Sequence, residues 1–105
     1  MSIIDLSNVN DYPYIKRFAV TTTAQEITIP KNATKITFGS IGALYFANIG
    51  EDGDAFGVDI TDYCFVPANN LISINMEIGR QSNRSLLIAM QSGSGHVNMI
   101  IEKDK

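Results

Sequence analysis

The residues best suited to chemistry are carboxylates gathered in one short stretch. Asp52 and Asp54 flank Gly53, and Asp59 follows closely. Calcium takes about six to eight oxygen ligands, and a glycine between carboxylates permits the sharp turn that binding loops need. Asp52, Asp54 and Asp59 are therefore candidate calcium ligands, but we favour the alternative, a solvated turn at the tip of a hairpin. The stretch lacks the alternating ligands and the closing Glu of an EF-hand loop, so we expect no resident metal or cofactor.

A second pair of interest is Ser94 and His96. They are two residues apart, so an extended strand would place both side chains on the same face. Gly93 and Gly95 surround the serine, but the strand-turn-helix context of a nucleophile elbow and an orienting carboxylate are both missing. The sequence also lacks a phosphate-binding glycine loop and the ligand spacing of a zinc site. These features predict that the protein is not an enzyme.

The single cysteine, Cys64, excludes an intramolecular disulfide framework. It stands between Tyr63 and Phe65 in an apolar run, with no His, Lys or Arg nearby to lower its pKa. We therefore predict a buried, inert thiol.

Composition narrows the class of protein further. The 105 residues are 45% hydrophobic and 18% charged, below the usual charged share of about 25%, which favours one globular domain. The net charge of -3 gives no cationic field for a phosphate backbone, so we expect no nucleic-acid partner. The sequence contains neither an export signal nor an apolar run near the roughly 18 residues of a membrane span, so we expect no membrane partner.

The elements that must position these residues are short β-strands. Apolar runs bounded by Gly, Pro, Asn or Ser predict seven to nine strands, within residues 16–22, 25–29, 35–38, 43–49, 55–60, 63–66, 71–78, 85–91 and 96–102. Strict alternation in 25–29 and 71–78 predicts one buried face, with Ile27 and Ile29 inward in the first and Ile72, Ile74, Met76 and Ile78 inward in the second.

Two runs are apolar on both faces. Residues 43–47 and 86–90 are either central strands covered twice or strands whose second face meets another subunit. A helix is the local alternative for 86–90, but the run is short and 92–95 follows as Ser-Gly-Ser-Gly, which favours a strand and a four-residue hairpin loop.

The expected architecture is an all-β, two-layer antiparallel β-sandwich, jelly-roll-like, with a short N-terminal arm. Residues 1–13 form the arm, because their polar residues follow no strand period, and 14–105 form the single sandwich domain. Tyr12 and Tyr14 flank Pro13 at the junction. They serve either as a plug over the end of the sandwich, which we slightly favour, or as anchors on a neighbouring protein.

One stretch carries a resemblance to a known group. Residues 18–30, FAVTTTAQEITIP, followed by 33–38, ATKITF, resemble a phrase of small virion proteins of tailed bacteriophages, in which a Thr-Ala-Gln turn leads into a short strand ended by Pro. The resemblance implies a β-sandwich that coats or joins parts of a capsid or tail. It transfers no functional residue, because the matching positions are scaffold.

The functional expectation follows from both arguments. We expect a virion structural protein, made in the host cytoplasm, that acts as a capsid decoration or head- or tail-associated protein, forms a homo-oligomer and contacts the major capsid protein or other virion proteins. The candidate contact residues are Ile3, Ile4, Leu6, Tyr12, Tyr14, Tyr45 and Phe46. The alternative is a small glycan- or ligand-binding module that uses the loops at 49–56 and 91–96.

Overall fold

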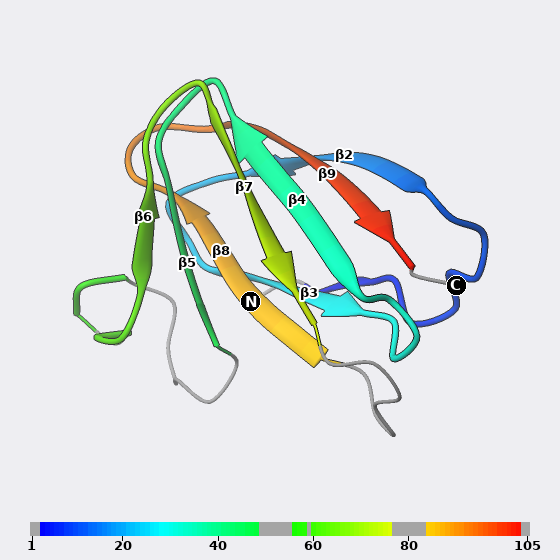
Figure 1. Cartoon of the computed structure of the whole chain (residues 1–105). Helices are drawn as coiled ribbons and strands as arrows, with labels where there is room; N and C mark the ends of the chain where they lie inside the picture. Colours follow the sequence, from blue (N-terminus) through cyan, green and yellow to red (C-terminus); the bar gives the residue numbers. More distant parts are fainter. Residues whose placement is uncertain (1–2, 49–55, 59, 77–83, 104–105) are drawn as a thin grey trace.

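The computed structural model describes residues 3–48, 56–58, 60–76 and 84–103. Within these ranges the chain forms strands and turns, and the strands lie in two sheets packed face to face (Figure 1). The described residues hold no helix with the length and apolar character that a membrane crossing needs. The predicted all-β sandwich is confirmed.

The two sheets contain five and four strands. The five-stranded sheet has the order β1 (Ile3–Asp5), β3 (Gln25–Ile29), β8 (Arg84–Met90), β5 (Leu44–Asn48) and β6 (Cys64–Val66). The four-stranded sheet has the order β2 (Tyr14–Val20), β9 (Gly95–Glu102), β4 (Lys35–Ser40) and β7 (Asn70–Asn75).

Strands β2 to β9 form a jelly roll. They pair as a nested series in which β2 meets β9, β3 meets β8, β4 meets β7 and β5 meets β6, all antiparallel. The ribbon then rolls up, so that β9 also pairs with β4, and β8 with β5. This nested pairing is typical of a double-sheet jelly roll, in which β1 and β6 remain the edges of one sheet and β2 and β7 those of the other.

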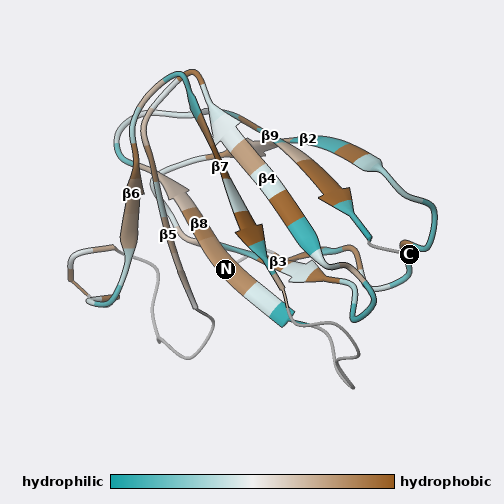
Figure 2. Ribbon diagram, in the orientation of Figure 1, coloured by the Kyte–Doolittle hydropathy of each residue, from teal (hydrophilic) through white to brown (hydrophobic). Residues whose placement is uncertain are grey.

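The core lies between the sheets and is built from alternate residues of their strands. Phe38 of β4 and Phe46 of β5 meet there edge to face, with ring centroids 5.3 Å apart. Figure 2 shows the alternation as brown and teal bands along β7, where Ile72 and Ile74 face the core. The buried members of the core are Leu6, Phe18, Val20, Ile27, Ile29, Ala33, Ile36, Phe38, Leu44, Val66, Leu86, Ile88, Met90, Val97, Met99 and Ile101.

Alternation was a sound guide to strand faces. In β3, Ile27 and Ile29 are fully buried, and Pro30, which has no N–H to donate to a ladder, follows its last residue. In 71–76 the predicted inward residues Ile72, Ile74 and Met76 pack against the core, while the residues between them are exposed. Ile78 lies outside the described residues.

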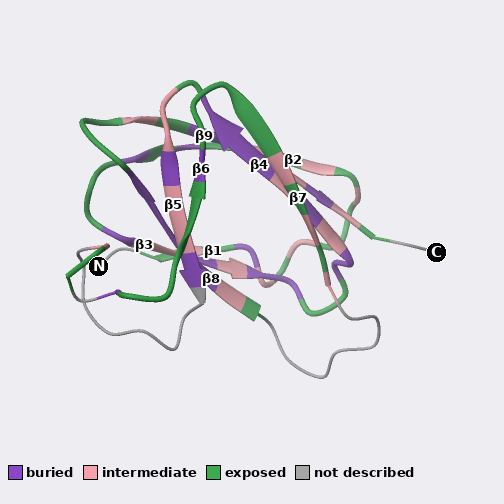
Figure 3. Ribbon diagram, turned by 60° about the vertical axis from the view of Figure 1, so that its left-hand side comes forward, coloured by how far each residue is buried: buried purple, intermediate pink, exposed green. Residues whose placement is uncertain are grey.

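The outer face of the five-stranded sheet carries a further layer. Ala24, Ala47, Ile60 and Leu87 form a second buried cluster there, with Phe56 packed against it. A tight turn places Phe56 and Ile60 side by side, and the two residues form an isolated β-bridge. Within this turn Gly57, at a φ of 87° that favours glycine, donates its N–H to the Ile60 carbonyl at 2.8 Å. Residues 86–90 of β8 are consequently buried on both faces within a single chain (Figure 3).

The arm joins the sandwich as an edge strand. Its residues Ile3–Asp5 form β1, which runs parallel to β3 with Ile4 opposite Ile27. The backbone continues the contact, because Leu6 donates its N–H to the Thr28 carbonyl at 3.1 Å. The other described strand pairs are antiparallel, as expected of the sandwich.

Three local predictions were wrong. Residues 55–60 form no strand among their described positions, only the isolated bridge between Phe56 and Ile60. The loop after β8 is not a hairpin, because β8 and β9 belong to different sheets and the loop crosses between them. Cys64 is exposed rather than buried, because β6 is the outermost strand of its sheet and an apolar run at a sheet edge is covered on fewer sides than a central one.

Candidate functional site

The predicted calcium ligands Asp52, Asp54 and Asp59 lie outside the described residues. Within the part of the chain that the structure describes, no group of three or more His, Cys, Asp and Glu side chains is arranged to hold a metal ion.

The arm residues divide between surface and core. Ile3 is 59% exposed, whereas Leu6 is buried in the core and Ile4 packs against it. Tyr12 and Tyr14 also pack against the core, and the Tyr12 hydroxyl lies 3.1 Å from the Val9 carbonyl and 2.6 Å from Asn32 Oδ1. Most of the arm is therefore part of the fold, and Ile3 is the predicted arm contact that reaches furthest into solvent.

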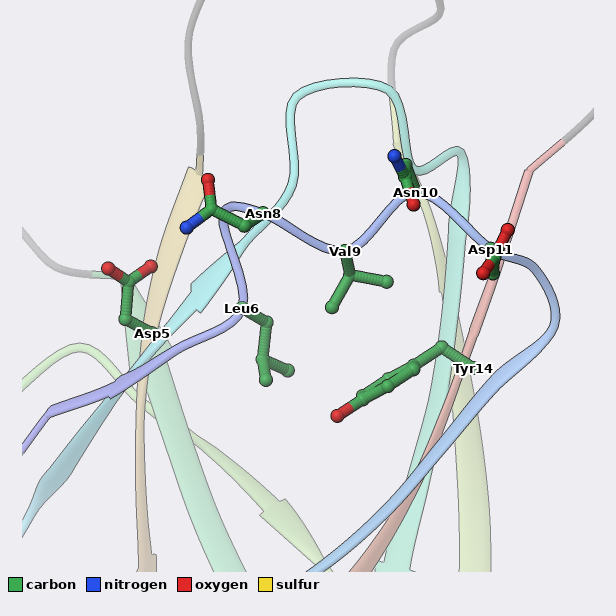
Figure 4. Close-up of a pocket in the computed structure, with 7 residues that line it drawn as sticks. All are labelled: Asp5, Leu6, Asn8, Val9, Asn10, Asp11 and Tyr14. Carbon is green, nitrogen blue, oxygen red and sulfur yellow. The ribbon is translucent and has the colours of Figure 1, made fainter.

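A shallow hollow of about 360 Å³ lies against the arm (Figure 4). Leu6, Val9 and Tyr14 point towards its middle, and polar side chains of the arm stand around the rim. One rim residue, Asp5, has a lowered pKa, because the Ser7 hydroxyl and the Ser7 backbone N–H, at 2.9 Å, hydrogen bond to its carboxylate. The carboxylate thus caps the turn that leads the chain from β1 towards β2.

The predicted contacts Tyr45 and Phe46 point to opposite faces of β5. Phe46 points to the inner face, where it packs against the core and against Phe38 but stays partly exposed. Tyr45 lies on the outer face, where its ring stacks on Phe56 at 5.7 Å and meets Tyr63 edge to face at 4.9 Å. The second face of 43–47 is thus covered, in part, by residues of the same chain.

Four rings join on this face, and we call them the outer aromatic surface: Tyr45, Phe56, Tyr63 and Phe65. Phe65 is opposite Tyr45 in the β5–β6 pair, with ring centroids 5.9 Å apart, and is 50% exposed. Tyr63 is 39% exposed and meets Phe56 at 5.6 Å. Val58, in the turn beside them, is 76% exposed. The four rings thus form a packed cluster whose rim remains open to solvent.

The outer aromatic surface adjoins a free strand edge. β6 ends its sheet, so one side of its backbone has no strand partner among the described residues. Figure 3 shows most of β6 in the colour of exposed residues. An opening of about 450 Å³ beneath it is lined by Phe46, Cys64, Ile74 and Leu86, together with Ala47, Asp62 and Tyr63. Sequence reasoning missed Tyr63 and Phe65, whose two-residue spacing was the available signal, and it named Phe56 only as the end of the loop at 49–56 in the ligand-binding alternative.

A different hollow, which we call the end pocket, lies at the end of the sandwich where the chain turns after β4 and after β8. It measures about 410 Å³. Its lining residues are Arg17, Ser40, Ile41, Gly42, Met90, Ser92, Ser94, Gly95, His96 and Asn98. Ser94 and His96 are thus brought to one pocket, but none of its described lining residues is an Asp or Glu that could orient the imidazole.

No protein-family model, curated protein or solved structure matches this chain. The outer aromatic surface and the end pocket therefore have to be interpreted from their own chemistry.

Proposed function

We propose that this chain is a structural protein of a virus particle, a capsid decoration or head- or tail-associated protein that acts through protein–protein contacts. The observation that carries the proposal is the outer aromatic surface beside the free edge of β6. Its partners would be further copies of the chain and the major capsid protein or other virion proteins.

The chemistry of this surface favours a protein partner. Contiguous apolar groups left in solvent are stabilised by covering them, and aromatic side chains are enriched where proteins meet. Phe65 and Val58 expose apolar area, and Tyr63 adds a hydroxyl that can hydrogen bond at the rim of a contact. The unpaired backbone of β6 offers main-chain hydrogen bonds to an approaching strand.

The remainder of the chain suits a repeated, passive role. With 18% charged residues, contacts of this protein would depend little on salt, and many copies on one particle would add weak contacts into firm attachment. Jelly rolls occur in viral capsid proteins and also in lectins, so the fold alone does not choose between assembly and ligand binding.

The test is the solution mass by light scattering at two protein concentrations. We expect an oligomer for the unmodified chain, of a mass that is a multiple of 11.5 kDa. Phe65→Ser should shift it to the monomer. Leu71→Ser is the matched control, because Leu71 is 64% exposed but lies on β7 of the other sheet. Equal masses for the two variants would contradict an assembly contact at the outer aromatic surface.

A second candidate function is a small ligand-binding module for a glycan. The end pocket favours it, because part of the predicted loop at 91–96 lines a hollow with three serine hydroxyls and the Asn98 amide. A panel of immobilised glycans separates the two functions: retention of the unmodified chain, lost in Ser94→Trp, would support the module, and no retention would count against it.

A further inference from the structure

We propose that the end pocket binds a small oxyanion, the carboxylate, sulfate or phosphate group of a polar ligand. The inference is independent of the assembly function, and it would make the ligand of the second candidate an acidic one.

The balance of charge in the end pocket favours an anion. The chain as a whole has 11 acidic and 8 basic residues, yet the described lining of this pocket contains the cation of Arg17 and no carboxylate, with the His96 ring as a further hydrogen-bonding group. Arg17 is opposite Asn98 and His96 is opposite Ala19 in the β2–β9 pair. Arg17 and His96 are therefore diagonal neighbours on the outer face, with Cα atoms about 7 to 8 Å apart. At that spacing the side chains of Arg17 and His96 can both contact one small ligand.

The uncharged lining supplies hydrogen-bond donors as well. Ser40 is only 7% exposed, and its hydroxyl oxygen accepts the Gly42 N–H at 3.3 Å. Among the described residues this is the one hydrogen bond of that side chain, so the hydroxyl hydrogen remains available to donate. A buried hydroxyl whose hydrogen has no acceptor within the protein is uncommon unless a ligand or a water molecule accepts that hydrogen bond. Ser92, Ser94 and the Asn98 amide add donors at the wall of the pocket.

Backbone hydrogen bonds fix the two turns beside the pocket. Gln91 donates its N–H to the Ala43 carbonyl at 3.0 Å, and Asn69 donates to the Ser40 carbonyl at 3.0 Å, so both turns are tied to their neighbours. Met90 is buried beneath, with its methyl group against Gly42 and Gly95, where larger residues would press on it. When the lining residues are already ordered before the ligand binds, less conformational entropy is lost on binding.

The size of the pocket sets the class of ligand. At about 410 Å³ it is at the small end of the range of about 300 to 1,000 Å³ in which proteins hold small molecules. One acidic monosaccharide fits such a volume, and so does an inorganic sulfate or phosphate with its water. Both sources share the oxyanion that Arg17 and Ser40 would recognise.

Titration of the full chain, followed by amide chemical shifts, tests the proposal. The probes are sodium sulfate, sodium phosphate and sodium glucuronate, with glucose as the neutral sugar and sodium chloride holding ionic strength constant. We expect saturable shifts for residues 40–42 and 92–96. Arg17→Gln and Ser40→Ala should each weaken the affinity, the former by about tenfold or more, because a charge-assisted hydrogen bond is lost. Arg84→Gln, an exposed arginine at the far end of β8, is the matched control.

The outcomes of this titration either support or overturn the oxyanion proposal. Saturation by glucuronate but not by sulfate or phosphate identifies an acidic sugar as the source, and saturation by all three identifies the oxyanion alone as sufficient. Equal saturation by glucose, equal affinities for the Arg17→Gln and Arg84→Gln proteins, or shifts that do not saturate would overturn the proposal. Because Phe65 and the end pocket lie on different parts of the fold, the mass measured by light scattering separates failure here from failure of the assembly function.

Discussion

Tyr45 and Phe46 are neighbours in the chain, yet their rings belong to different layers of the molecule. Phe46 meets Phe38 between the sheets at 5.3 Å, and Tyr45 meets Tyr63 outside them at 4.9 Å. Successive side chains of a strand point to opposite faces, so β5 supplies both the core and the outer aromatic surface. A substitution on one face should therefore act on stability, and one on the other face on association.

The first prediction concerns this division. Phe46→Ala removes a ring packed against Phe38, and we expect it to lower the free energy of unfolding by about 2 to 3 kcal/mol. Phe65→Ala removes a half-exposed ring and should cost less than about 1 kcal/mol. Urea unfolding of both variants checks the difference. Equal losses would mean that the two faces of the five-stranded sheet contribute alike.

A second prediction separates the two roles of the arm. Leu6→Ala opens a cavity in the core and should cost about 2 to 3 kcal/mol of stability, whereas Ile3→Ala should change it by less than about 0.5 kcal/mol. Urea unfolding measures both. Removal of residues 2–12 as a block would confound contact with folding, because it deletes Leu6. A large loss of stability in Ile3→Ala would contradict the placement of this side chain in solvent.

The third prediction concerns the pKa of Asp5. Hydrogen bonds from the Ser7 hydroxyl and the Ser7 backbone N–H lower this pKa below its ordinary value of 3.8. A lowered pKa in the folded state means that Asp5 stabilises the fold above pH 3.8, and that this contribution is lost as the pH falls through the folded pKa.

Ser7→Ala should therefore raise the pKa of Asp5 towards 3.8, as followed by the chemical shift of its carboxyl carbon. Ser73→Ala, whose hydroxyl pairs with that of Thr37 in the other sheet, is the control and should leave the pKa unchanged. An unaltered pKa in Ser7→Ala would show that the hydroxyl does not bond to the carboxylate in solution.

The fourth prediction follows from the exposure of Cys64. The thiol should react with a disulfide reagent in the folded protein at a rate within about tenfold of that in urea, because the reagent reaches an exposed thiol without unfolding. The measurement belongs at low protein concentration, since association through β6 would cover the thiol. If Cys64 reacts only after the protein unfolds, its thiol is buried, as the sequence predicted, and the exposed position is contradicted.

The sequence predicted the alternating strands well and the double-faced ones incompletely. In β3 and β7 the period of two fixes which residues face the core, because burial on one face leaves a direct trace in residue type. In 86–90 both faces are apolar, and the pattern cannot say what covers the second one. The structure places Ile60, Phe56 and Ala24 there, from segments distant in the chain.

The candidate sites depended on the same long-range placement. Ser94 and His96 were recognisable as a pair, but Arg17 and Ser40 reach the end pocket from β2 and β4, and no local pattern connects them. The apolar run that contains Tyr63 and Phe65 predicted a buried Cys64, and only the strand order reveals that β6 is an edge. Residue type predicts that a side chain is buried or takes part in binding, whereas the strand order determines which other residues surround it.

The most direct test of assembly through the outer aromatic surface is amide hydrogen exchange of the unmodified chain at low and high concentration. We expect protection to rise with concentration in residues 56–58 and 63–66, with no change in 71–75 of β7, the edge of the opposite sheet. Exchange that is independent of concentration in 63–66, or protection that rises on β7 instead, would contradict the proposed contact.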